Sequence, residues 1–272
     1  MKTSVEKSDR DSNLTRSEWR TLAVNPEGVI HITNRVGRIN IEGGADNSGF
    51  LITRLQVSGD DPEAAAALLE QLGVDVTESE EGLFLTGVAP AEVAHSGLGH
   101  RIDMNIVLPE HSKLILRHVD GDISVTGLKG DLIIRHEVGN ITCKQISGDM
   151  EIMLEDGNVN LDRIEGGSLT IDLEDGNVRG MHMRGSANVR VEEGDVTLAY
   201  GPEVTDICSI HVTTEEGHIH LTTPGNMLPD DRNGAHTRQG DGARWKSALK
   251  QGRVIHVIKL KAENGEVEVT AK

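Results

Sequence analysis

The chain has 272 residues, with 44 Asp and Glu against 27 Lys and Arg, which gives a formal net charge of −17. This balance argues against a nucleic-acid binder, because such proteins carry a basic footprint. With 2 Phe, 1 Tyr and 2 Trp, platforms for stacking bases or sugars are almost absent. Two cysteines, Cys143 and Cys208, do not make a disulfide framework. Since no apolar stretch reaches the length of a signal peptide or a membrane span, we expect a cytoplasmic protein without direct membrane insertion.

The first 110 residues contain irregularly spaced elements. Residues 1–17 are polar and charged, and we expect a disordered tail there. Residues 18–110 are expected to contain strands, a hairpin and one short helix, which together cap the repeat that follows. The helix is predicted over 64–72, after Asp61 as the capping residue and Pro62 in the first turn. The predicted strands are 29–42 (two strands around Gly37), 50–57, 74–77, 83–86 and 101–108.

From residue 121 onward, glycine recurs at a fixed step. The glycines nine residues apart are Gly121, Gly130, Gly139, Gly148 and Gly157, and the series resumes at Gly167, Gly176, Gly185 and Gly194. Doubling the step aligns apolar residues in rows, for example Leu132, Met150, Leu169, Ala187 and Ile210. A second row consists of Ile141, Val159, Val178, Val196 and Ile219. Such regularity is typical of a repeat protein.

Within each repeat, apolar and polar residues alternate, which is the period of a strand. We therefore predict an all-β, single-domain protein with one helix. Its residues 111–272 are expected to form a single-stranded β-solenoid (β-helix) of roughly 18-residue coils, right-handed or mixed. Stacked coils bury a continuous narrow core, and glycine and Asn or Asp suit the corners. Residues 222–244 are rich in Pro, Gly, Asn and Asp and are predicted to form a loop, followed by strands over 253–261 and 266–270.

These features resemble a bacterial β-strand-repeat family of unknown function, labelled "putative adhesin". The similar segments are 37–43 (Gly-Arg-Ile-Asn-Ile-Glu-Gly), the acidic helix near 61–72, 106–109 (Ile-Val-Leu-Pro) and the Gly-Asp/Asn coils of 121–221. The resemblance extends over residues 20 to 272 and implies a β-solenoid without a catalytic motif.

A ladder of carboxylates is predicted at one corner of the coils. Its members are Glu155, Asp156, Glu174, Asp175, Glu192, Glu193 and Glu215, with Glu137 and Glu216 at its ends, followed after the glycine by Asn140, Asn158, Asn177 and Asp195. Carboxylate and amide oxygens at this spacing can bind Ca²⁺ or a basic partner. The alternative, which we favour, is a hydrated column of turns that keeps the protein soluble.

Other polar residues fit the core or the surface more simply than a site. His118 and His136 align with inward positions, where neutral imidazoles are expected to form hydrogen bonds. Cys143 aligns with an inward leucine row and is expected to be a small core residue. His218 and His220 alternate with apolar residues and should point outward, two metal ligands without a third.

No enzyme motif occurs in the chain, so we expect a non-catalytic scaffold or protein-binding module with no cofactor. The alternatives are a self-assembling, filament-like protein, a regulatory acidic protein with a basic partner and, less favoured, a β-helix enzyme acting on polysaccharides. A basic segment lacking Asp and Glu would allow head-to-tail association; it contains Arg244, Lys246, Lys250, Arg253, Lys259 and Lys261. The alternative, which we favour, is an ordinary amphipathic terminal strand with solvated lysines. Partners are thus another protein or a second copy, and no nucleic acid.

Overall fold

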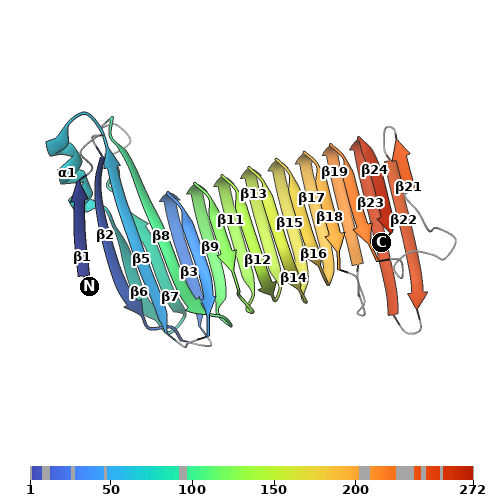
Figure 1. Ribbon diagram of the computed structural model, residues 1–272, viewed down its shortest axis with the longest axis horizontal. Coiled ribbons are helices and arrows are strands. Elements are labelled where there is room, and N and C mark those ends of the chain that lie inside the picture. The colour runs from blue at the N-terminus through green and yellow to red at the C-terminus, as the bar shows by residue number, and fades with distance from the viewer. Residues whose placement is uncertain are drawn as a thin grey trace. The chain divides into compact units, whose positions relative to one another are not determined.

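The computed structural model describes residues 2–7, 13–25, 28–45, 48–91, 97–201, 209–224, 236–239, 243–251 and 254–271. The chain divides into two compact units, residues 1–129 and 130–272. Both contain β-solenoid coils in which one strand lies in each of two sheets (Figure 1). The predicted all-β solenoid with one helix is confirmed.

The first unit contains ten strands and one helix among its described residues. They are β1 (Lys2–Lys7), β2 (Asn13–Leu22), β3 (Val29–Val36), β4 (Ile39–Gly44), β5 (Gly49–Ser58), α1 (Pro62–Gln71), β6 (Gly73–Ser79), β7 (Gly82–Val88), β8 (Gly99–Pro109), β9 (Lys113–Asp120) and β10 (Ile123–Thr126). One sheet has the order β1-β2-β5-β8-β4-β10 and the other has the order β6-β7-β3-β9. The predicted helix, hairpin and strands between 29 and 109 are all present.

Strands β3 and β4 form a solenoid coil rather than part of a cap. Strand β3 pairs in parallel with β9, and β4 pairs in parallel with β10, so that Ile39 lies opposite Ile123. The sequence from 45 to 112 is therefore an insertion between two stacked coils. For this reason residues 111–129 belong to the first unit, and the predicted boundary at 110 is displaced.

The predicted disorder of residues 1–17 is wrong where the structure describes them. Strands β1 and β2 pair with each other, and β2 pairs along its whole length with β5. The sequence obscures β2 because two of its inward residues are charged, Arg16 and Glu18. The Arg16 guanidinium binds the Glu18 carboxylate at 3.1 Å and donates to the Leu72 carbonyl at 2.6 Å, after the end of α1. Burial of this pair is thus compensated by charge and hydrogen bonds.

The helix α1 begins where its capping residue predicts. The Asp61 carboxylate accepts hydrogen bonds from the backbone N–H groups of Glu63 (3.0 Å) and Ala64 (3.1 Å). These contacts satisfy donors that a helix start leaves without an intrahelical partner. The buried face of α1 consists of Ala65, Leu68 and Leu69.

The second unit stacks coils of two strands each. Its strands are β11 (Leu132–Val138), β12 (Ile141–Ser147), β13 (Met150–Asp156), β14 (Val159–Glu165), β15 (Ser168–Asp175), β16 (Val178–Met183), β17 (Ser186–Glu193), β18 (Val196–Tyr200), β19 (Ser209–Glu216), β20 (Ile219–Thr223), β21 (His236–Gln239), β22 (Ala243–Gln251), β23 (Val254–Asn264) and β24 (Glu266–Ala271). Within this unit one sheet has the order β12-β14-β16-β18-β20-β24-β21 and the other β11-β13-β15-β17-β19-β23-β22.

The predicted rows are the hydrogen-bonded registers of these sheets. Leu132 lies opposite Met150, which lies opposite Leu169, and the same register continues to Ile210. In the other sheet Ile141 lies opposite Val159, and this register continues to Ile219. All members of both rows are buried, so the two sheets enclose one continuous apolar core.

The corner glycines allow successive coils to touch through their backbones. Gly157, Gly176 and Gly194 have φ of 140°, 134° and 142°, which side chains rarely adopt. A methyl group on Gly176 would overlap the carbonyl oxygen of Gly157 in the preceding coil. The backbone N–H of Gly157 donates to the Asp175 carbonyl at 2.9 Å, so hydrogen bonding continues around the corner.

A second corner uses left-handed residues that are not glycine. Gln145, Arg163 and His182 have φ of 54°, 56° and 54° at equivalent places in β12, β14 and β16. The left-handed residue shifts the strand's alternation, so that Cys143 and Ile146 are both buried although they are three residues apart. The sequence hides this bend because no glycine marks it.

The stretch 222–244 is only partly a loop. It includes β21, which pairs with β24, and the start of β22, which pairs antiparallel with β23. Its Gly, Asn and Asp residues favour turns locally, but pairing with strands distant in sequence provides backbone partners. Residues 222–223 are the end of β20, whereas residues 225–235, 240–242 and Arg253 lie outside the described residues. The predicted strands 253–261 and 266–270 correspond to β23 and β24.

We predict that Gly176→Ala destabilises the protein by about 3 kcal/mol or more. The added methyl group would overlap the Gly157 carbonyl oxygen, and the backbone of alanine would be strained at this φ. The matched control is Gly166→Ala, where φ is +70° and no atom lies within 4 Å of the added methyl group. This control should cost about 1 kcal/mol. Urea unfolding followed by circular dichroism measures both; equal losses would contradict the role assigned to the corner.

Candidate functional site

The acidic ladder lies where the strands of the β11–β13–β15–β17–β19 sheet end. Asp156 is opposite Asp175, Asp175 is opposite Glu193, and Glu193 is opposite Glu216. The preceding glutamates make a second column along the same corner. All seven candidates stand in these two columns, exposed or half-exposed: Glu155, Asp156, Glu174, Asp175, Glu192, Glu193 and Glu215. What the columns bind stays a prediction.

Only part of the ladder is neutralised by cations. The Arg190 guanidinium bridges two rungs, at 3.2 Å from Glu192 Oε1 and 3.3 Å from Glu215 Oε1. The residues in register with Arg190 on the two preceding coils are Asp172 and Met153. Among the described residues, therefore, the side chains of Glu155 and Glu174 have no ion pair. Neighbouring rungs lie about 4.8 Å apart, so their charges repel and favour hydrated side chains that point outward.

The described residues contain no group of three His, Cys, Asp or Glu side chains that could hold a metal ion. Two further predicted side chains have partners within the protein instead. His218 Nδ1 accepts from the Glu266 N–H at 3.2 Å, and His220 Nδ1 lies 2.8 Å from Glu268 Oε2.

The amides beside the ladder form a continuous chain of hydrogen bonds. Asn158 donates to Asn140 Oδ1 through both its backbone N–H (3.2 Å) and its side chain (3.0 Å), and Asn177 repeats both bonds to Asn158 at 3.1 Å. The backbone N–H of Asp195 then donates to Asn177 Oδ1 at 2.9 Å. The sequence prediction included these residues as possible ligands, but their contacts give them a structural role.

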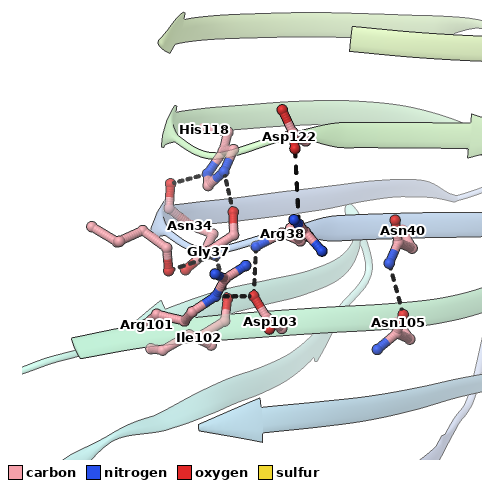
Figure 2. Close-up of polar contacts among 11 residues, drawn as sticks. Asn34, Gly37, Arg38, Asn40, Arg101, Ile102, Asp103, Asn105, His118 and Asp122 are labelled. Atoms are coloured by element: carbon pink, nitrogen blue, oxygen red, sulfur yellow. Dashed lines mark hydrogen bonds and ion pairs between the residues drawn. The ribbon is translucent and has the colours of Figure 1, made fainter. Parts of the chain in front are cut away.

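In the first unit, the buried His118 on β9 connects its own coil to the corner between β3 and β4 in the neighbouring coil. Its Nδ1 lies 3.0 Å from the Asn34 carbonyl oxygen and its Nε2 lies 2.7 Å from that of Gly37 (Figure 2). The Asn34 side chain in turn donates to the Ile102 carbonyl at 2.8 Å. A neutral imidazole can donate to only one of the two carbonyl groups. This corner ties the inserted β8 to the coil of β3 and β4, so it serves the fold.

Two other predicted core residues are inward in the second unit. His136 is buried in the row of Leu154, Leu173 and Val191. Cys143 is fully buried and free, and burial raises the pKa of its thiol to about 12. Cys208, the second cysteine of the chain, lies outside the described residues.

The first unit exposes an apolar face that the sequence analysis missed. Trp19 on β2 and Ile52 on β5 are direct cross-strand partners, and Phe50 stands two residues before Ile52 on the same face. Their exposed fractions are 43% for Trp19, 51% for Ile52 and 41% for Phe50. We call these three residues the apolar face. Two of the chain's five aromatic residues thus point into solvent together.

A hollow of about 430 Å³ adjoins this face on strands β5, β8, β4 and β10. Phe50 and Ile52 line its apolar side, and Asn40, Asn105 and Glu42 line its polar side. The Asn40 side chain donates to Asn105 Oδ1 at 2.9 Å, which fixes both amides (Figure 2). The hollow therefore combines exposed apolar groups with a few polar groups held in place, as binding sites do.

The sequence contained one signal for this face. In β5, residues 50–53 are Phe-Leu-Ile-Thr, so apolar residues occupy both phases of the alternation. Leu51 is inward and Phe50 and Ile52 are outward. Trp19 gave no such signal, because no strand was predicted over β2.

The family model Toastrack DUF4097 matches residues 54–272. The chain belongs to this family. The match confirms the expected β-strand-repeat family of unknown function. No curated protein matches the chain.

Two solved structures resemble this Toastrack chain. One, described as a "putative adhesin" from Bacteroides fragilis NCTC 9343, has 16% identity and a TM-score of 0.46 over 77% of this chain and 90% of its own. The other, a "putative cell adhesion protein" from Clostridium sporogenes ATCC 15579, has 11% identity and a TM-score of 0.28, over 94% of this chain and 100% of its own. In the described part of the chain, no helix is long and apolar enough to cross a membrane.

We predict that Asn158→Ala lowers the free energy of unfolding by about 1–2 kcal/mol, because the Asn177 donors lose their acceptor. The matched control is Asn188→Ala, which changes an exposed amide on β17 that has no side-chain hydrogen bond among the described residues. Its effect should stay within about 0.5 kcal/mol. Thermal and urea unfolding compare the two; a larger loss for Asn188→Ala would refute the structural role of the amide chain.

We also predict that the Cys143 thiol is unreactive in the folded protein at about pH 8, because its raised pKa leaves almost no thiolate. The measurement uses Ellman's reagent on a Cys208→Ser variant, so that only Cys143 contributes. Reaction should be prompt in urea and slow without it. Equal rates in the two conditions would contradict the burial of this thiol.

Proposed function

We propose that this chain is a non-catalytic protein-binding module that docks a partner on the apolar face of its first unit. The observation that supports this is the exposure of Trp19, Phe50 and Ile52 side by side. Grouped apolar side chains on a surface mark interaction sites, whereas single ones are ordinary. Aromatic residues in particular supply much of the binding free energy at protein interfaces.

The adjoining hollow supports a protein partner over a reaction. Its lining contains Glu42 as the one titratable side chain, without a histidine, cysteine or lysine beside it. An activated nucleophile needs a base or a cation beside it, and the lining offers Glu42 neither. Asn40, Asn105, Ser124 and Thr126 instead offer hydrogen bonds to a peptide backbone or polar side chains at the rim.

The chemistry of the partner follows from the charge of the chain. A net charge of −17 attracts positively charged surfaces over the range that salt screening permits. We therefore infer a partner with an apolar centre and a basic rim. The buried free thiol of Cys143 is compatible with the reducing cytoplasm that the sequence predicts.

We predict that Ile52→Lys weakens binding of this partner by roughly ten-fold or more, because it places a charge in the apolar contact. To identify the partner, a photoreactive amino acid replaces Asn105, and the protein is crosslinked inside the cells that produce it. The partner is then purified and its dissociation constant is measured against each variant.

The matched control is Met153→Lys, which changes an exposed apolar residue on the second unit (42% exposed, against 51% for Ile52). It should leave the affinity unchanged. The proposal fails if Ile52→Lys binds as the unaltered chain does, or if Met153→Lys loses as much. A crosslink to a second copy of the chain would show self-association in place of a separate partner.

A further inference from the structure

A basic hollow lies on the outer face of the second unit, on strands β12, β14 and β16. Its volume is about 250 Å³, and it is lined by Thr142, Lys144, Asn160, Asp162, Arg179, Leu161 and Met181. The hollow thus places two cations, Lys144 and Arg179, beside a single carboxylate, Asp162.

The one carboxylate in the hollow is already bound by others. Asp162 Oδ1 lies 2.8 Å from His182 Nδ1, and Asp162 Oδ2 lies 3.5 Å from Arg163 Nη1. The hydrogen bond from His182, with the charges of Arg163 and Lys144, lowers the pKa of Asp162. Asp162 thus stays ionised, and its single charge is shared among several cations.

Arg179 is not among the side chains that contact Asp162. Within the part of the chain that the structure describes, its guanidinium has neither an ion pair nor a hydrogen bond. Asn160, its direct register partner on β14, likewise makes no side-chain hydrogen bond there. A guanidinium offers a planar fork of N–H donors, and an amide and an ammonium group beside it add further donors.

We propose that this hollow binds the carboxylate of an Asp or Glu side chain presented by another protein chain. Arg179 holds the carboxylate by paired hydrogen bonds, Lys144 adds a point charge, and Asn160 donates from the side. An acidic sugar is the weaker alternative, because no aromatic ring lines the hollow to stack on a sugar. The site is separate from the apolar face and stands without it.

The test uses a short fluorescent peptide of alternating Glu and Gly at about 0.15 M salt, which screens the net negative charge of the chain, with binding measured by anisotropy on the full chain. Arg179→Gln and Lys144→Gln should each weaken binding by roughly five- to ten-fold, the loss of one charged hydrogen-bonding partner. The same peptide with Gln in place of Glu should bind the unaltered chain at least as weakly as the Glu peptide binds either variant. Circular dichroism checks that each variant is folded.

The matched control is Arg135→Gln, which removes the same charge from an exposed position in the other sheet of this unit. It should leave the affinity unchanged, as should Ile52→Lys, so that failure of this site and failure of the apolar face are told apart. Equal loss with Arg135→Gln would mean general charge attraction and overturn the proposal. Equal binding of the Gln peptide, or tighter binding of a galacturonate oligomer, would overturn it as well.

Discussion

The structure depends on parallel coils that stack in register, with backbone against backbone at the corners. This is possible only where no side chain intervenes, as at Gly157, Gly176 and Gly194. Hydrogen bonds then continue through the corners, for instance from Val159 N to the Asn177 carbonyl at 2.9 Å. Because each coil places its residues directly over those of the last, every position becomes a column of like side chains about 4.8 Å apart.

The consequences of this register depend on the chemistry of each column. Apolar columns form the core. Amide columns satisfy one another, as Asn140, Asn158 and Asn177 do. Carboxylate columns repel and stay hydrated, except where Arg190 bridges two rungs. The acidic ladder consists of two such columns, and what it binds stays a prediction.

Candidate binding surfaces occur where repetition is interrupted. The apolar face lies on β2 and β5, antiparallel strands brought beside the coil of β3 and β4 by the inserted segment. The basic hollow lies beside the bend of Arg163 and His182, where β14 and β16 change their alternation. In both places, side chains of different kinds meet, and this mixture is the basis of the two binding proposals.

The sequence by itself determined the solenoid of the second unit, since its alternation and glycine step are local patterns that the register copies directly. It also determined helix α1 through Asp61 and Pro62, and the inward place of Cys143. Only the tertiary structure decided that 29–44 stacks on 113–126, that β2 is a strand, and that Trp19, Phe50 and Ile52 share a face. The reason is physical, because these features depend on pairing between distant segments. Neighbours that no local pattern specifies decide whether a buried charge such as Arg16 is compensated and whether a ring such as Phe50 is exposed.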